Sequence, residues 1–320
     1  LPYRLQGAEG PIELVEEVEL PVALADTPRA RAAIRLLHLV AGVSYYKCVV
    51  PTALVVPSLS PAERTLVVAL YDQGLRELAH RNGLAVPVPV DDGPRAQDQA
   101  TAYAVQRALV DDRLARGERV VGWKVGYASA VMREQMGVDE PNLGPLTDAM
   151  LLADGDRLPH AGLHPRVEPE IAVVLDGDVP AGTVLSPADL PVRELRLALE
   201  VVDSAWQDYR FAIGDNTADS SSAAFGVLGP VLVPGTAWGD LAVELLLDGE
   251  VVATGFADAA MGDPVASAAW LAGALAAAGY ARGLRAGDVV LTGGLTRAMP
   301  LLPGAVVSAR AGGAVVTLTG

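Results

Sequence analysis

The stretch PRVEPEIAVVLDG at residues 165–177 places two glutamates at the head of an otherwise apolar run. In a strand, Val167, Ile171 and Val173 would share one face, while Glu168 and Glu170 would share the other. Like charges side by side on a partly buried sheet repel each other and must be compensated. The stretch therefore predicts a strand that packs one face on a core and turns two carboxylates toward a compensating group.

A third carboxylate follows the same pattern in LRLALEVVD at residues 195–203, where Glu200 alternates with the leucines. If the two strands are neighbours in one sheet, Glu200 lies beside Glu168 and Glu170. Three carboxylates on a shared face are unfavourable unless some are protonated or a cation lies among them. Oxygen ligands of this kind suit Mg²⁺ or Mn²⁺. The alternative is an exposed edge strand whose acids face water, and the residue pattern alone favours neither.

A lysine within the strand-like segment GWKVGY at residues 122–127 supplies a candidate positive charge. Lys124 lies between two glycines and alternates with Trp123 and Val125. A lysine near a metal site has a lowered pKa and can transfer protons or hold an anionic substrate. The alternative interpretation is an ordinary solvated charge.

The order of elements predicts a β-rich α+β domain over residues 92–320. Short strands punctuated by glycine and proline follow residue 119, with helices expected at 96–117 and 263–279. A polar, serine-rich loop that leads into an apolar strand is expected within 213–229, where the hydroxyls could bind substrate or form turns. Residues 1–91 are expected to form a small α/β segment, with a strand at 11–24, helices at 27–42 and 60–83, and a linker at 86–95.

Composition excludes several classes of protein. The net charge of −15 and pI of about 4.6 argue against a nucleic-acid or anionic-membrane surface. Cys48 is the single cysteine, so an intrachain disulfide is excluded. The chain opens without the pattern of a secretion signal, and its most apolar run, Val265–Tyr280, is too short to span a bilayer of roughly 30 Å. A cytoplasmic location is expected.

Several segments resemble one enzyme group in the same order along the chain. They are TAYAVQ, GWKVGY, MGVDEPNLGPL, PRVEPEIAVVL, ALEVVDS, GDPVASAAWLA and GDVVLTGGLT, which run from about Asp98 to Gly320. Together they resemble the 2-keto-4-pentenoate hydratase and 4-oxalocrotonate decarboxylase group of the fumarylacetoacetate hydrolase-like superfamily. The resemblance implies a mixed β-roll of the fumarylacetoacetate hydrolase C-terminal type, with flanking helices.

The resemblance also implies a site and a reaction. It implies that Glu168, Glu170 and Glu200 hold Mg²⁺ or Mn²⁺, that Lys124 is the active-site lysine, and that Ser222 keeps a matching polar position. The expected substrate is a short 2-oxo or 2-hydroxy-dienoic acid from meta-cleavage of an aromatic ring. The cation would bind its carboxylate and 2-oxygen, and Lys124 would move protons before water adds to the distal double bond. In the decarboxylase branch the same centre would stabilise the dienolate left by loss of CO₂. A homo-oligomer is expected.

Three positions differ from that group's pattern: Ser220 replaces asparagine, Asn142 replaces an acidic residue, and Gly294 replaces serine. Each change removes or exchanges a polar group near the expected pocket, and so concerns the substrate rather than the metal. A catalytically weak scaffold is the alternative from a different functional class.

The N-terminal segment resembles another family. GVSYYKCVVP and LYDQGLRELAHRNGL, within residues 1–90, are similar to the opening part of the UDP-N-acetylmuramoyl-L-alanyl-L-glutamate epimerase family. Because only that opening part is present, no catalytic residue and no epimerase activity are carried over. The chain is then a natural fusion, a recombined open reading frame or an engineered chimera, in which this segment is a fragment of unknown role, for example an interaction module.

Overall fold

The computed structural model of the chain describes residues 4–7, 10–13, 98–115, 117–130, 133–134, 138–159, 164–204, 209, 211–233 and 237–320. The helices expected at 27–42 and 60–83, the linker at 86–95 and Cys48 lie outside these residues. Backbone proximity divides the chain into two compact units. The first comprises Leu1–Arg116, His160–Leu163 and Ser204–Asp219, and the second comprises Gly117–Pro159, His164–Asp203 and Ser220–Gly320.

In the first unit the described elements are a short antiparallel hairpin and two helices: β1 (Arg4–Gly7), β2 (Gly10–Glu13), α3 (Gln99–Ala115) and α5 (Ile213–Ala218). The helix expected at 96–117 is thus confirmed as α3. Asp98 caps it, because its carboxylate accepts from the Thr101 amide at 2.8 Å. The two helices contact each other, and the buried Gln106 side chain donates to the Thr217 carbonyl at 2.7 Å.

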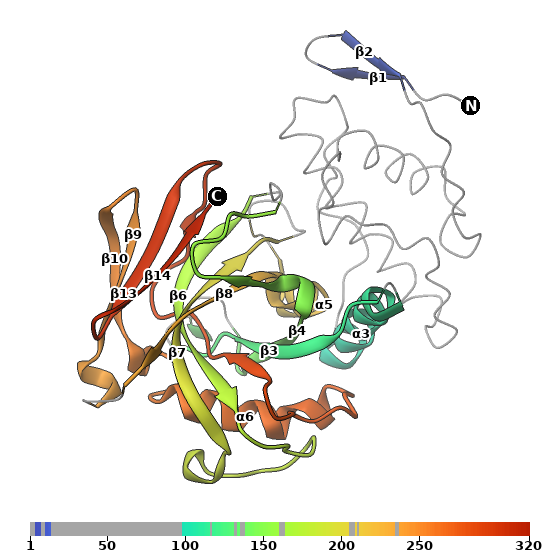
Figure 1. The fold of residues 1–320 in the computed structure, drawn as a ribbon. Helices are drawn as coiled ribbons and strands as arrows, with labels where there is room; N and C mark the ends of the chain where they lie inside the picture. The colour runs from blue at the N-terminus through green and yellow to red at the C-terminus, as the bar shows by residue number, and fades with distance from the viewer. Residues whose placement is uncertain are drawn as a thin grey trace. The chain divides into compact units, whose positions relative to one another are not determined.

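The second unit is built on a large mixed sheet. Within the described residues it has eight strands in the order β4-β3-β11-β6-β7-β8-β5, with β12 paired to β6 beside this path. Figure 1 shows β6, β7 and β8 as long curved strands. The bounds are β3 (Val120–Gly126), β4 (Asn142–Thr147), β5 (Leu151–Ala153), β6 (Arg166–Leu175), β7 (Val192–Val202), β8 (Ala223–Leu232), β11 (Val289–Leu291) and β12 (Met299–Pro300).

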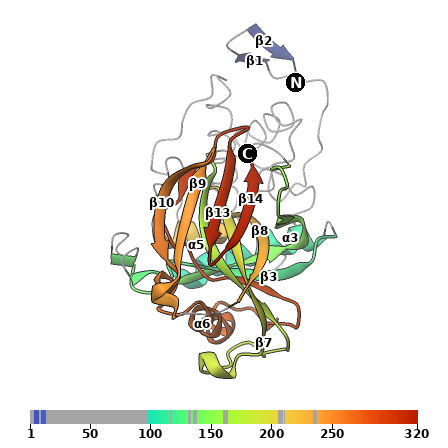
Figure 2. The ribbon, with the colours of Figure 1, turned by 60° about the vertical axis from the view of Figure 1, so that its left-hand side comes forward.

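A smaller antiparallel sheet, in the order β10-β9-β13-β14, packs on β6, β7 and β8 of the large sheet. In Figure 2 its four strands are seen in front of the large sheet. Alternating valines and leucines on its inner face are buried, including Val243, Val307 and Val316. The bounds are β9 (Ala242–Leu247), β10 (Glu250–Phe256), β13 (Val306–Ala311) and β14 (Ala314–Thr319).

One long helix, α6 (Pro264–Ala277), contacts β3 and β6. Asp263 caps it by accepting from the Val265 amide at 2.8 Å, and proline occupies its first turn. The helix expected at 263–279 is therefore confirmed. Single 3₁₀ turns lie at Asp148–Met150, Pro187–Asp189, Trp238–Asp240 and Ala257–Ala259. No helix of the described residues is long and apolar enough to cross a membrane.

The position of β6 decides between the two interpretations of its acids. It lies inside the sheet, with β11 on one side and β7 on the other. The alternative of an exposed edge strand is therefore wrong, because both edges of β6 are hydrogen-bonded to neighbours. The strand expected at the end of the polar segment 213–229 is confirmed as β8, which begins at residue 223, but residues 213–218 form the helix α5 rather than a loop.

Candidate metal centre

The register of the large sheet brings the three glutamates together. Glu168 lies opposite Glu200 in the antiparallel pair β6–β7, and Glu170 lies opposite Ala198. Since side chains two apart share a face, all three carboxylates project from the same face. Their nearest oxygens lie within 4.8 Å of one another. No other group of three acidic, histidine or cysteine side chains in the described part of the chain meets this geometry.

Lys124 lies on the same face, two strands away. Leu291 of β11 is in register with Lys124 on one side and with Ala172 on the other, so Lys124 has the same orientation as Glu170. Its Nζ lies 2.9 Å from Glu200 Oε2. Lys124 is 3% exposed and Glu200 is 1% exposed. The interpretation of Lys124 as a solvated charge is therefore wrong.

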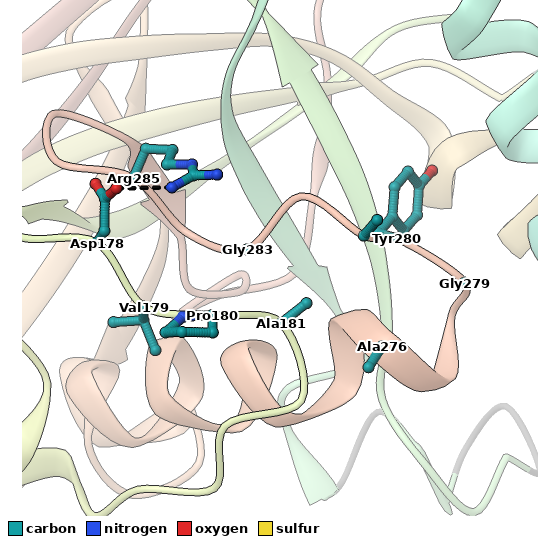
Figure 3. Close-up of a pocket in the computed structure, with 10 residues that line it drawn as sticks. Asp178, Val179, Pro180, Ala181, Ala276, Gly279, Tyr280, Gly283 and Arg285 are labelled. Carbon is teal, nitrogen blue, oxygen red and sulfur yellow. Dashed lines mark hydrogen bonds and ion pairs between the residues drawn. The ribbon is translucent and has the colours of Figure 1, made fainter.

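Trp123 shows what lies on the opposite face of β3. Its ring packs edge-on against Tyr280, just beyond α6, with ring centroids 4.9 Å apart. A hollow of about 590 Å³ opens beside Tyr280, lined by residues of the 178–181 loop and the end of α6 (Figure 3). Its charged groups, Asp178 and Arg285, pair with each other at 2.7 Å. This hollow is lined by other residues than the glutamate cluster.

The carboxylates of β6 are held in an environment that disfavours their charge. Burial raises the pKa of Glu168 to about 7, with a further contribution from Glu200 and an opposing one from Lys124. Burial also raises the pKa of Glu170 well above its ordinary value, and the neighbouring carboxylates add to this. Both raised pKa values indicate that Lys124 alone does not fully compensate the negative charge of the three carboxylates.

The pKa of Lys124 is shifted in the direction opposite to the one expected from the sequence. Burial alone would lower the pKa of Lys124, but the charges of Glu200, Glu170 and Glu168 outweigh it, and the pKa is raised. The ammonium form is thus the stable one in the cluster without a cation. The expected lowering by a neighbouring metal stays a prediction for the loaded site.

The segment after β11 supplies contacts to the glutamates that were not predicted from the sequence. The Gly293 amide donates to Glu170 Oε2 at 2.9 Å. Thr292 anchors the segment, because its hydroxyl donates to the Ile171 carbonyl at 2.7 Å. The sequence signal for these contacts is the glycine pair Gly293–Gly294, which follows the buried strand β11 after one residue. Such a pair allows the backbone to approach a neighbouring side chain closely.

Gly294 follows directly and lies against Glu168. A Cβ at residue 294 would fall 2.5 Å from Glu168 Cδ. The glycine at this position therefore leaves room for the Glu168 carboxylate. The absence of the serine expected at residue 294 thus has a steric explanation, because a side chain there would collide with the Glu168 carboxylate.

The serines of residues 220–222 form a turn beside Lys124. The Ser221 carbonyl accepts from Lys124 Nζ at 3.0 Å, a contact that was not predicted from the sequence. Ser222 is buried, and its carbonyl accepts from the Asp203 amide at 2.8 Å. The structure thus places Ser222 next to the residue that binds Lys124. Asn142 is buried beside the same turn, since a Cβ at Gly126 would meet both Asn142 Oδ1 and Ser221 Oγ.

Comparison with protein families agrees with this architecture. The model of the fumarylacetoacetate hydrolase C-terminal family matches residues 120–318, which include both sheets, α6 and the glutamate cluster. The chain belongs to this fumarylacetoacetate hydrolase family. The mixed roll expected from the sequence is confirmed by its similarity to 4-oxalocrotonate decarboxylase from Pseudomonas putida, solved with magnesium and adipate. That match has a TM-score of 0.67 at 27% identity and covers 82% of this chain and 98% of the other.

The relatives of this fumarylacetoacetate hydrolase family protein include enzymes with two different names, a hydratase and a decarboxylase. A 2-keto-4-pentenoate hydratase from Burkholderia vietnamiensis is 41% identical over 229 residues, which cover 69% of this chain and 84% of the relative. A 4-oxalocrotonate decarboxylase from a Pseudomonas species is 35% identical over 204 residues, which cover 63% of this chain and 79% of the relative. The resemblance drawn from the sequence motifs is thereby confirmed.

A second family model, the MurL N-terminal domain, matches residues 1–114. The resemblance of the N-terminal segment to the epimerase family is thus confirmed as a match to that family's N-terminal domain. The match extends past residue 91 and includes most of α3.

Proposed function

We propose that the protein is a divalent-metal-dependent hydro-lyase that acts on a short 2-hydroxy-dienoic or 2-oxo-enoic acid. The observation that carries the proposal is the cluster of Glu168, Glu170 and Glu200 with Lys124. Three carboxylates and one ammonium have a net charge of minus two, which a divalent cation neutralises. The hydratases among the relatives support the same assignment.

The donor atoms fit Mg²⁺ or Mn²⁺. Glu170 Oε1 and Glu200 Oε1 are buried and have no hydrogen-bond partner among the described residues. A buried carboxylate oxygen without a partner is costly, and binding a hard cation removes that cost. The other oxygen of each carboxylate is held, by the Gly293 amide for Glu170 and by Lys124 for Glu200. Glu168, Glu170 and Glu200 are therefore the proposed metal ligands.

The proposed chemistry needs an electron sink at the 2-oxygen of the substrate, and a bound cation supplies it as a Lewis acid. Lys124 is buried, and its Nζ would deliver a proton to the carbon chain during tautomerisation and then receive one back. Ser222 is proposed as the hydroxyl that orients the substrate or the water that adds to the distal double bond. Burial of Lys124 and Glu200 keeps bulk water away from the transferring proton.

A metal-dependent loss of dienoate absorbance tests the assignment. Glu168→Gln and Glu200→Gln are expected to abolish it, whereas Glu194→Gln on the partly exposed end of β7 is expected to retain it. Full activity in both cluster variants would show that the glutamates are not the metal ligands.

Decarboxylation of a 4-oxalocrotonate-type 2-oxo acid is the second candidate. It is favoured by the similarity to the Pseudomonas putida decarboxylase over 98% of that protein. Both reactions develop negative charge on the 2-oxygen, so the glutamate cluster suits either. A panel of 2-hydroxydienoates and oxalocrotonate, each with Mg²⁺ and Mn²⁺, separates hydration from release of CO₂.

A catalytically weak scaffold makes a different prediction for ligand binding. Oxalate imitates the carboxylate and oxo group of a 2-oxo acid. For the proposed enzyme, calorimetry is expected to show that oxalate binds only when Mg²⁺ is present. Binding of Mg²⁺ without any binding of oxalate would favour the scaffold.

The proposal also includes a division of the chain into two parts. We place the catalytic domain at residues 92–320 and an N-terminal fragment at 1–91, as in a fusion of two families. A homo-oligomer and a cytoplasmic location belong to the same proposal. Light scattering of the full chain and of residues 92–320, with cell fractionation, tests these statements.

A further inference from the structure

The turn at Ser220–Ser222 has an unusual backbone. All three residues have left-handed φ values, of 52°, 54° and 58°. Residues with a Cβ seldom adopt this conformation, and normally do so singly. Three in succession are strained, and such strain persists only where the surroundings hold it in place.

The carbonyls of this turn have specific partners in the fold. The Ser221 carbonyl accepts from Lys124 Nζ at 3.0 Å, and the Ser222 carbonyl accepts from the Asp203 amide at 2.8 Å. A carbonyl holds an ammonium group without taking its proton or neutralising its charge. Without this acceptor, the partners of Lys124 among the described residues would be carboxylates alone.

Two glycines of the neighbouring strands admit the turn. Gly144 of β4 lies opposite Lys124, and a Cβ there would fall 3.0 Å from the Ser220 carbonyl carbon. Gly126 of β3 is the second, where a Cβ would fall 3.2 Å from Ser221 Cβ and closer still to its hydroxyl. A side chain at either position cannot coexist with the turn in its present place.

We propose that the left-handed turn Ser220–Ser222 is a positioning element for Lys124, and that Gly126 and Gly144 are the positions that allow it to dock. The inference rests on the proposed function, in which Lys124 transfers protons. Two fixed acceptors, the Ser221 carbonyl and Glu200, define one place for the end of a long flexible side chain. The turn thereby directs the ammonium group without being a metal ligand itself.

The composition of the chain makes Lys124 easy to follow. Lys47 and Lys124 are the two lysines of the sequence. Reductive methylation of the Mg²⁺-loaded full chain, followed by mass spectrometry of peptides, therefore reports on Lys124 separately. Slow labelling of Lys124 is expected in the native protein, and rapid labelling after unfolding.

Gly144→Ala is the main variant. It is expected to raise the labelling rate of Lys124 about tenfold, because a hydrogen bond to a charged group is lost. A misplaced ammonium group is expected to lower kcat by about a hundredfold with little change in KM. The affinity for Mg²⁺, measured by calorimetry, is expected to stay the same.

Gly229→Ala in β8 is the matched control. Its new Cβ would fall 2.5 Å from Val316 Cβ and 2.8 Å from the Leu197 carbonyl, so it crowds the same sheet away from Lys124. A lower Tm with unchanged labelling of Lys124 is expected. Equal labelling of Lys124 in Gly144→Ala and Gly229→Ala would overturn the proposal.

Substitutions of Ser221 keep the test decisive if Gly144→Ala does not fold. Ser221→Gly keeps the carbonyl and relieves the strain, so slow labelling of Lys124 and a higher Tm are expected. Ser221→Val disfavours the left-handed backbone, so fast labelling is expected. Fast labelling in both would mean that the carbonyl does not hold Lys124. If the labelling results hold but no substrate is turned over, the positioning stands and the proposed function fails.

Discussion

Glu168 and Glu200 lie directly opposite each other on the antiparallel strands β6 and β7, with both carboxylates on one face of the sheet. A cross-strand pair of like charges is destabilising. The fold nevertheless brings Glu170 and Lys124 to the same place. The pair is therefore a cost to the metal-free protein that a bound cation would remove.

The first prediction concerns pH. The pKa of Glu168 is about 7 in the folded protein, above its ordinary value of 4.5. Between these values the folded state binds more protons than the unfolded state, so the free energy of unfolding decreases as pH rises. The Tm of the metal-free protein is expected to fall from about pH 5 to about pH 8. Glu168→Gln should show a shallower fall in calorimetric scans, and an identical slope would contradict the assignment. Saturating Mg²⁺ should reduce the fall in the unsubstituted protein.

The second prediction compares a buried ion pair with an exposed one. Lys124→Gln leaves Glu200 without its ammonium partner in a buried site, and is expected to cost about 3 kcal/mol in the metal-free protein. Arg285→Gln breaks a half-exposed pair with Asp178 and is expected to cost at most about 1 kcal/mol. Urea unfolding of the two variants measures both. Similar costs would mean that Lys124 does not compensate the glutamates.

The third prediction concerns metal affinity. Glu170→Gln removes a proposed ligand while keeping its shape, and is expected to weaken Mn²⁺ binding by more than about a hundredfold. Glu194→Gln changes a carboxylate paired with Arg196 on β7 and is expected to bind Mn²⁺ normally. Titration followed by electron paramagnetic resonance counts free Mn²⁺ directly. Unaltered affinity in Glu170→Gln would remove Glu170 from the ligand set.

The fourth prediction tests the space beside Glu168. Gly294→Ala places a methyl group 2.5 Å from Glu168 Cδ, so the carboxylate must adopt another rotamer. Metal affinity is expected to change about tenfold with little loss of stability, because the end of a flexible side chain can move. Gly273→Ala in α6 meets its neighbours at ordinary distances of 3.8 Å or more, and is expected to stabilise the helix by about 0.5–1 kcal/mol. Unchanged metal affinity in Gly294→Ala would show that the Glu168 carboxylate does not need that space.

The faces of β6 and β7 were predictable because strand alternation decides them. Glu168 and Glu170 share a face in any regular strand, and Glu200 follows the same rule in its own strand. Their register was not predictable, because the connection between the strands includes residues 176–191, whose path no short-range signal determines. The pairing of Glu168 with Glu200 therefore depends on tertiary structure.

The surroundings of Lys124 were less predictable still. Its burial depends on β11, which comes from a distant part of the sequence and lies between β3 and β6. The role of the Ser221 carbonyl depends on a left-handed backbone that serine does not favour. Local propensity predicts a flexible polar loop at this turn, and packing against Gly126 and Gly144 overrides it. Strand β4 is weakly marked in the sequence, because NLGPLT carries glycine and proline, which are uncommon inside strands.

The insertion of β11 between β3 and β6 has a consequence for biosynthesis. The hairpin that carries Glu168, Glu170 and Glu200 can form on the ribosome well before residues 289–291 have been translated. Lys124 emerges earlier than all three, yet its strand joins theirs only through β11. During elongation the acidic hairpin thus exists without its ammonium neighbour. The cluster of Lys124 with the three glutamates is therefore complete only after residues 289–291 have been translated.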